Sequence, residues 1–267
     1  MPAPRCCICG TVRNCGKYLD KIFVNMEIIS RLFSNYAIII YADASNDNTI
    51  AKLKQYQQKN PRLTLIINTE ALLKYRTHRI AKGRNKCLEI IRTKYPDYEY
   101  FIMMDCDDRC SGRVDSNVLA KYLHSITNCD AISFNHPCGY YDCWALSIRP
   151  FVLSCHHFKD NEQWTRYIKT LLRLTPKNRL VNCLSAFNGF SLYRTAKFIS
   201  GTYSGKFDVS YIPRNLIKEN IKVSGLPKRG AQTEQDCEHR KFHMQAVFKN
   251  NARIRISPHC LFTNCTS

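Results

Sequence analysis

Three aspartates follow directly on an apolar run in the first half of the chain. The run is Tyr100–Met104, and the acids are Asp105, Asp107 and Asp108. An apolar stretch of this length without helical period is typical of a buried strand. Because closely spaced carboxylates repel one another, they favour a cation, and Mg²⁺ or Mn²⁺ combines one or two carboxylates with phosphate oxygens. The pattern predicts a metal-bridged phosphate ligand, with a solvated acidic turn as the alternative.

A second acidic turn follows an earlier strand-like run. The aliphatic stretch Tyr36–Tyr41 leads into Asp43 and Asp47. The carboxyl ends of parallel strands meet at the edge where open α/β folds bind ligands, so both turns are expected to face one crevice. Four cations lie between them in the sequence: Arg76, Arg79, Lys82 and Arg84. Arginine offers a bidentate fork suited to a diphosphate, and the alternative is a solvated basic helix face.

The elements that must position these side chains alternate over the first 108 residues. Strands are expected at Arg5–Gly10, Tyr36–Tyr41, Leu63–Ile67 and Tyr98–Met104, and helices at Gly16–Phe33, Ile50–Tyr56 and Ile80–Ile91. This alternation predicts an α/β, Rossmann-like fold with a mostly parallel sheet flanked by helices.

The second half of the chain is less regular. Helices are expected at Val114–Ser125, Glu162–Leu174 and Gln235–Phe248, strands at Ala131–Phe134 and Ala252–Ile256, and loop-rich segments at Leu180–Tyr193 and Thr202–Gly230. No linker or repeat divides the sequence. One domain over residues 1–267 is therefore expected, with a nucleotide-type half to residue 108 and an elaborated half from 109 to 267.

Composition points to an anionic partner and to reduced thiols. The formal net charge of +19 predicts attraction to sugar nucleotides, nucleic acid, acidic glycans or a membrane surface. Several of the 15 cysteines fall at apolar positions, which indicates buried thiols in a reducing, cytoplasm-like compartment. The alternative at Cys6, Cys7, Cys9 and Cys15 is a zinc site. Neither a secretory signal nor a membrane-spanning stretch is expected.

Four motifs in the first 110 residues resemble those of GT-A-fold glycosyltransferases, especially the family-2-like group. They are Gly10–Asn14, similar to the first-strand turn; Ala42–Thr49, similar to the Asp-x-Ser-x-Asp-x-Thr turn; Arg79–Asn85, similar to the helix start; and Asp105–Asp107, similar to the Asp-x-Asp metal motif. Two further segments, Tyr140–Ala145 and Ser185–Phe190, resemble capsule-associated mannosyltransferases of fungi and their relatives in large DNA viruses. A viral origin would place the protein in the host cytoplasm or the virion.

The resemblance implies a metal-dependent transfer of a sugar from a UDP- or GDP-linked donor to a hydroxyl of a glycan or glycoprotein, with Mn²⁺ or Mg²⁺ as cofactor. It implies that Thr11 and Arg13 line the nucleotide pocket, that Asp43 binds the base, that Arg79 and Arg84 approach the diphosphate, that Asp105 holds ribose and metal, and that Asp107 ligates the metal. Ala42 stands where a first acid is usual, which weakens the assignment of the base.

The remaining candidates lie late in the chain. Asp236 and Glu238 are candidates for the catalytic base, because Thr233–His239 resembles the acidic segment that opens the late helix of these enzymes; a helix cap is the alternative. His259, expected in a loop after a strand, is the candidate for a further metal ligand. Trp144 and Asn188 are candidates for the sugar or acceptor pocket, with packing as the alternative.

A different class of function also fits the charge. A basic nucleic-acid-binding or metal-dependent nucleic-acid-processing protein would share the positive charge and the clustered carboxylates. The sequence lacks an evident basic stripe interleaved with aromatic residues, which is the feature that single-strand binders use. Nucleic acid is therefore the less favoured partner.

Overall fold

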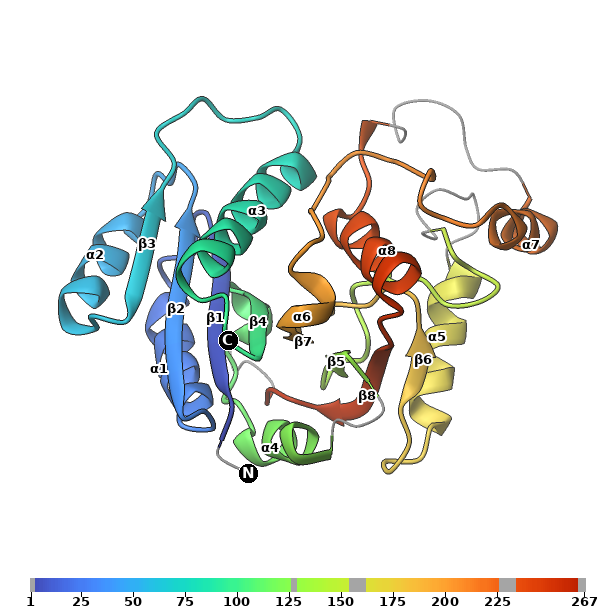
Figure 1. Cartoon of the computed structure of the whole chain (residues 1–267), viewed down its shortest axis with the longest axis horizontal. Coiled ribbons are helices and arrows are strands. Elements are labelled where there is room, and N and C mark those ends of the chain that lie inside the picture. Colours follow the sequence, from blue (N-terminus) through green and yellow to red (C-terminus); the bar gives the residue numbers. More distant parts are fainter. Residues whose placement is uncertain (1–2, 126–128, 154–161, 226–233, 264–267) are drawn as a thin grey trace.

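The computed structural model describes residues 3–125, 129–153, 162–225 and 234–263. An eight-stranded sheet runs through these residues in the order β3-β2-β1-β4-β7-β5-β8-β6 (Figure 1). The strands are β1 Arg5–Val12, β2 Asn35–Ala42, β3 Leu63–Ile67, β4 Tyr100–Asp105, β5 Ala131–Asn135, β6 Val181–Cys183, β7 Phe190–Arg194 and β8 Ile254–Cys260. The helices are α1 Leu19–Ser30, α2 Thr49–Lys59, α3 Arg76–Lys94, the 3₁₀ turn η1 Asp108–Cys110, α4 Ser116–Ser125, α5 Glu162–Leu174, α6 Thr195–Phe198, α7 Arg214–Ser224 and α8 Glu238–Asn250.

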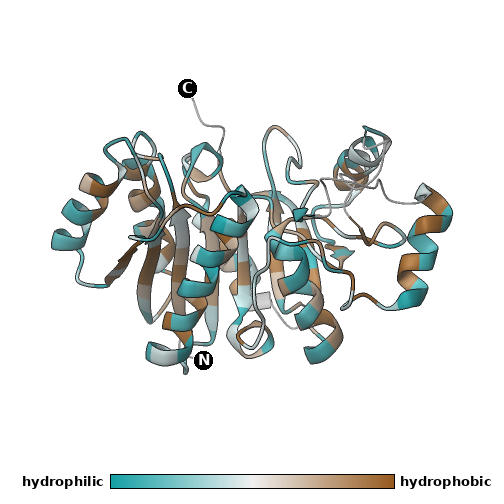
Figure 2. Cartoon of the chain, turned by 90° about the horizontal axis from the view of Figure 1, so that it is seen from above, coloured by the Kyte–Doolittle hydropathy of each residue, from teal (hydrophilic) through white to brown (hydrophobic). Residues whose placement is uncertain are grey.

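The first half is the predicted parallel α/β unit. Strand β1 pairs in parallel with β2 and with β4, and β2 pairs in parallel with β3. Helices α1 and α2 pack on one face of the sheet, and α3 and α8 on the other (Figure 2). The carboxyl ends of β1, β2 and β4 therefore meet at one edge, and the expected fold class is confirmed.

The cysteines of β1 belong to the core. Cys6 lies in the hydrophobic cluster on one face of the sheet, whereas Cys7 and Cys9 lie in the cluster on the other, and all three side chains are fully buried. This is the alternation that a central strand imposes on its side chains. No group of three or more potential metal ligands occurs among the described residues. The zinc alternative is therefore wrong, and the described cysteines are free thiols.

Two segments expected to be loop-rich contain regular structure. Within Leu180–Tyr193, β7 pairs antiparallel with both β4 and β5, and the short β6 joins β8 at the edge. Within Thr202–Gly230, helix α7 begins directly after Pro213 and ends at Gly225, which has a φ of 72°. The proline and the glycine therefore bound a helix, because they favour its start and its stop.

Helix α3 ties the two halves of the chain together. The side-chain amide of Asn85 donates to the carbonyl of Tyr203 at 3.0 Å and accepts from the backbone amide of Tyr203 at 2.8 Å. At the start of the helix, Thr77 donates through its hydroxyl to the carbonyl of Gly205 at 3.2 Å. A side chain on Gly205 would clash with the backbone of Thr77, so glycine is required for this close approach. In the described part of the chain, every helix is too short or too polar to cross a membrane.

Candidate active site

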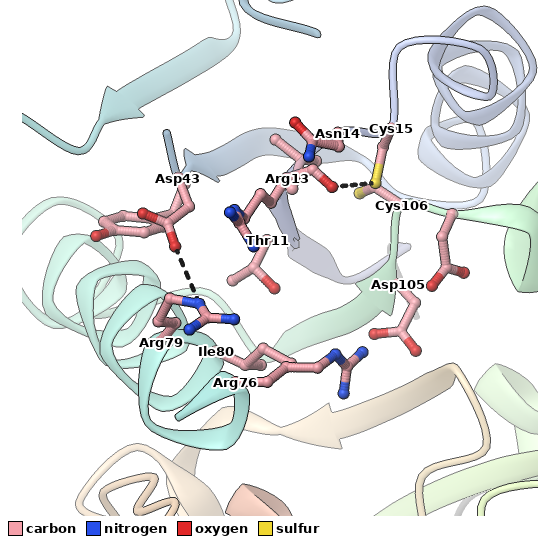
Figure 3. Close-up of a pocket in the computed structure, with 13 residues that line it drawn as sticks. Thr11, Arg13, Asn14, Cys15, Asp43, Arg76, Arg79, Ile80, Asp105 and Cys106 are labelled. Atoms are coloured by element: carbon pink, nitrogen blue, oxygen red, sulfur yellow. Dashed lines mark hydrogen bonds and ion pairs between the residues drawn. The ribbon is translucent and has the colours of Figure 1, made fainter. Parts of the chain in front are cut away.

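A cleft of about 190 Å³ opens at the carboxyl edge of the parallel strands (Figure 3). The expected site residues that line it are Thr11, Arg13, Asp43, Arg79, Asp105 and Asp107, joined by Val12, Asn14, Cys15, Tyr41, Arg76, Ile80 and Cys106. A single water needs only about 15 Å³ of such space, so the cleft accommodates a ligand far larger than an ion. Both acidic turns therefore contribute to one crevice, as expected.

The loops that follow β1 and β2 are fastened to each other. Asp47 accepts hydrogen bonds of 3.0 Å from the backbone amides of Gly16 and Thr49. Asn14, with a positive φ of 53°, accepts from the amide of Asn46 at 3.0 Å. Asp47 thus acts as a structural clamp that fixes the rim of the cleft, and of the two acids in this turn only Asp43 lines the cavity.

Asp43 is held in place at the end of β2. Its Oδ1 accepts hydrogen bonds from the side-chain amide of Asn68 at 2.8 Å and from the amide of Ala44 at 3.1 Å. Its Oδ2 lies 3.9 Å from Nε of Arg79. The side chain is only 7% exposed, yet it lines the cleft. A buried carboxylate oriented in this way can accept a hydrogen bond from a ligand.

The first turn of α3 brings arginines to the cleft. Arg79 donates to the carbonyl of Leu73 at 2.7 Å, which orients its guanidinium beside Asp43. Arg76 is exposed and points toward Asp105 (Figure 3). Helix N-termini carry partial positive charge, so the arginines and the backbone of α3 together favour an anion at this position.

Arg84 lies behind the cleft and does not line it. Its guanidinium is 2% exposed and donates through Nη2 to Oδ1 of Asp105 at 2.9 Å. Its Nη1 contacts both Glu238 and His239. The guanidinium also lies 4.5 Å from the ring centre of Phe187. Its two Nη donors already serve the carboxylates of Asp105 and Glu238, so the structure places Arg84 behind the cleft, and its approach to a diphosphate stays a prediction.

The acids at the end of β4 suit a divalent cation. Burial and the charge of Asp107 raise the pKa of Asp105 to about 8. Burial likewise raises the pKa of Asp107, although the amide of Arg109 donates to it at 3.0 Å. Two neighbouring carboxylates with raised pKa values fit Mg²⁺ or Mn²⁺, which take one or two protein carboxylates and complete their shell with phosphate and water oxygens.

The two acids proposed from the late helix are both buried and paired. Asp236 accepts from Nε of Arg240 at 2.9 Å and from the amide of Cys237 at 2.7 Å. Glu238 opens α8 and forms the buried ion pair with Arg84. Asp236 therefore lies just before α8 and is held by Arg240 of that helix, whereas Glu238 belongs to the network that reaches Asp105.

A further acid, Asp142, was not singled out from the sequence. Its backbone amide and that of Tyr141 both donate to Oδ1 of Asn188, at 3.1 and 3.0 Å. Its own Oδ1 accepts from the amide of Ala145 at 3.2 Å, and within the described residues no hydrogen bond reaches its Oδ2. Burial and the charge of Glu238 raise the pKa of Asp142 to about 6. The motif Tyr140–Ala145 contains this acid, but the sequence of the motif does not indicate that Glu238 of α8 lies near it.

Asn188 and Trp144 pack beside the loop that carries Asp142. Asn188 adopts a φ of 55° and donates to the carbonyl of Phe134 at 2.9 Å, so it fixes the Asp142 loop to the sheet. Trp144 packs partly buried against the core, and its carbonyl accepts from Arg240. Neither residue lines the cleft, so for both the arrangement favours the packing alternative.

His259 lies apart from the aspartates. It is part of β8, where its Nε2 is hydrogen-bonded to the carbonyl of Lys177 at 3.0 Å and its ring meets that of Tyr122 edge-on. The described residues contain no group of three metal-binding side chains, so the structure does not join His259 to Asp105 and Asp107. The expectation of a loop was wrong because β8 continues past Pro258, beside a register shift in its pairing with β5.

Comparison with solved structures places the fold. Residues 1–349 of TarS from S. aureus share 12% identity with a TM-score of 0.51, covering 97% of this chain and 59% of TarS 1–349. The same TarS fragment in complex with UDP gives 13% identity, a TM-score of 0.50 and the same coverage. The mannosyltransferase PcManGT from Pyrobaculum calidifontis, in complex with GDP-Man and Mn²⁺, gives 14% identity and a TM-score of 0.46, covering 75% of this chain and 48% of that one. The chain thus spans less than two thirds of the length of each of these proteins.

Comparison of sequences identifies the family. No curated protein matches the chain in sequence. Residues 7–199 match the family described as glycosyl transferase family 2. This match covers more than half of the chain and includes both acidic turns, α3 and the Asp142 loop. The chain therefore belongs to glycosyl transferase family 2.

Proposed function

We propose that this protein is a metal-dependent glycosyltransferase that moves a sugar from a nucleoside-diphosphate sugar to a hydroxyl of a glycan or glycoprotein. The observation that carries the proposal is the cleft itself, in which Asp43, Asp105 and Asp107 lie beside Arg76 and Arg79. A cavity that places carboxylates at two points and arginines between them suits a ligand with a polar base, a diphosphate and a cation. Membership of the family supports the same reaction class.

On the donor side, each residue has a role that its geometry supports. Asp43 accepts a hydrogen bond from the nucleotide base, while Thr11 and Arg13 line the nucleotide pocket. Arg76 and Arg79 bind the diphosphate oxygens and stabilise the negative charge that grows on them as the glycosidic bond breaks. Asp105 and Asp107 would hold Mn²⁺ or Mg²⁺, which supplies Lewis-acid stabilisation of the leaving diphosphate when bound. Arg84, which lies behind the lining of the cleft, holds Asp105 in position.

On the acceptor side, a carboxylate must take the proton of the attacking hydroxyl. Asp236 is committed to Arg240, and Glu238 to Arg84. Asp142 is partly exposed and keeps Oδ2 without a hydrogen bond among the described residues. We assign the role of general base to Asp142, with Glu238 raising its proton affinity, because a base needs an accessible oxygen and a pKa near the working pH.

Release of UDP or GDP from a panel of nucleotide sugars tests the proposal. The wild-type protein is expected to turn over one of them only when Mn²⁺ or Mg²⁺ is present. Asp107→Asn should abolish this turnover, and Asp97→Asn, which changes an exposed acid away from the cleft, should leave it intact. Turnover that needs no metal and survives Asp107→Asn would contradict the assignment of these acids.

A further inference from the structure

Helix α5 presents a cationic stripe to solvent. Its buried face consists of Trp164, Ile168 and Leu172. Arg166, Lys169 and Arg173 are exposed and recur at intervals of three and four residues, which places them on the opposite face of the helix. The flank of this stripe carries two exposed apolar side chains, Tyr167 at 44% and Leu174 at 70% exposed.

Helix α7 repeats the same arrangement. Arg214, Lys218 and Lys222 are exposed and spaced four residues apart, so they too form one stripe along the helix. Val223, 53% exposed, follows Lys222 near the end of the helix and lies about 100° around the helix axis from it. Among the described residues, neither Lys218 nor Lys222 forms an ion pair, and the same holds for Lys169 and Arg173 of α5.

Both helices lie at one end of the molecule. Figures 1 and 2 place α5 and α7 at the end of the long axis opposite to α2 and β3. This end belongs to the second half of the chain, away from the nucleotide cleft. Exposed large apolar side chains are few in the described residues, and three of them are here: Tyr167, Leu174 and Val223. Unpaired cations and exposed apolar groups therefore gather at the same end.

We propose that this α5–α7 end is a docking surface for an anionic lipid membrane. Basic residues beside a negatively charged bilayer each gain electrostatic attraction, and exposed apolar side chains at the same surface gain by entering the headgroup region. Nucleic acid or an acidic glycan would match the cations but would give Leu174 and Val223 no apolar environment to enter. The combination of both features favours the lipid surface.

Co-sedimentation with lipid vesicles tests this inference without any nucleotide, so it does not depend on the proposed activity. The wild-type protein is expected to bind vesicles of pure phosphatidylglycerol and not those of pure phosphatidylcholine. A triple variant with Lys169→Glu, Arg173→Glu and Lys218→Glu should bind phosphatidylglycerol at least about 100-fold more weakly, since each basic residue near the surface contributes about a fivefold gain. Circular dichroism establishes that the variant is folded.

The matched control reverses the same number of charges at the other end of the molecule. Lys21, Lys54 and Lys59 are exposed on α1 and α2, and their replacement by Glu should leave most of the vesicle binding intact. Equal losses in the two triple variants would show that net charge alone drives binding, which would overturn the proposal. Absence of wild-type binding to phosphatidylglycerol would overturn it as well.

A single apolar substitution separates a membrane from a purely ionic partner. Leu174→Ser should weaken vesicle binding severalfold, whereas Val24→Ser, at a position 54% exposed on α1, should not. If Leu174→Ser has no effect, and single-stranded RNA binds the α5–α7 end more tightly than the vesicles do, the surface is a nucleic-acid site and the proposal is wrong.

Discussion

The guanidinium of Arg84 joins Asp105, at the end of β4, to Glu238, at the start of α8. Nη2 donates to Asp105 at 2.9 Å, and Nη1 pairs with Glu238 in the protein interior. Arg84 is therefore a positioning residue that fixes Asp105 and Glu238 relative to each other. Its removal leaves the buried carboxylate of Glu238 without a counter-charge, which is more costly than the loss of an exposed ion pair.

Arg84→Met should destabilise the protein by about 3–5 kcal/mol, because breaking a buried ion pair leaves a buried charge without a partner. Arg76→Met provides the comparison, since Arg76 is exposed at the rim of the cleft. It should leave the free energy of unfolding nearly unchanged and weaken nucleoside-diphosphate binding. Urea unfolding of both variants measures the difference, and equal stability of the two would show that the buried pair is not a structural support.

Asp43→Asn should weaken nucleotide binding by about 10- to 150-fold, because a hydrogen bond to a charged acceptor is worth about 1.5–3 kcal/mol. The fold should persist, since the amide oxygen of Asn can still accept from Asn68. Isothermal titration with UDP and with GDP measures the change for each base. An unchanged dissociation constant for both nucleotides would remove Asp43 from the base pocket.

Metal affinity should depend on pH through Asp105. Its pKa of about 8 lies above the usual value for an unfolded chain. The protonated carboxyl is therefore favoured in the metal-free fold, and its contribution to stability is complete below about pH 4 and is lost as pH rises through 8. A bound cation requires the deprotonated form, so affinity for Mn²⁺ should fall about tenfold for each pH unit below 8.

Thermal unfolding with and without MnCl₂ at pH 6 and pH 8 measures this effect. The stabilisation by Mn²⁺ should be larger at pH 8 in the wild-type protein. Asp105→Asn should remove both the stabilisation and its pH dependence. Equal stabilisation at the two pH values would mean that no proton leaves Asp105 when the metal binds.

The acids of the acceptor side should separate into catalytic and structural ones. Asp142→Asn should lower kcat by about 10²- to 10⁴-fold, the usual contribution of a general base, with little change in stability. At saturating Mn²⁺, kcat/KM of the wild-type protein should rise with pH through about 6, where Asp142 loses its proton. Asp236→Asn should instead destabilise the fold, because it breaks the buried pair with Arg240. A variant Asp142→Asn that keeps full activity would return the role of base to Glu238.

The donor side of the site was predictable from the sequence because its signals are local. Asp43 and Asp105 each follow a strand of a parallel sheet, and that topology alone brings their strand ends together. Arg79 was expected near this edge for the same reason, and in the structure it lines the cleft from the first turn of α3. The strand Leu63–Ile67 and the helix Glu162–Leu174 also have the predicted bounds.

The rest of the site depends on contacts between distant segments. Arg84 lies about 140° around the helix from Arg79, so one of them faces the cleft and the other faces α8. Strand β7 is short and gains its hydrogen bonds from β4 and β5, which lie far away in the sequence. The strand expected at Ala252–Ile256 instead continues past Pro258 to Cys260, because a strand can continue past a proline beside an irregular register. The periodicity of apolar residues along a sequence does not reveal such contacts between distant segments.

Our central claim is that Asp105 and Asp107, at the end of β4, bind a cation that in turn binds a nucleoside diphosphate. Isothermal titration of UDP and GDP into the protein, with and without MnCl₂, tests it most directly. We expect one nucleotide to bind only in the presence of Mn²⁺, with binding lost in Asp107→Asn and kept in Asp97→Asn. Binding that is equally strong without metal, or that is unchanged in Asp107→Asn, would contradict the claim.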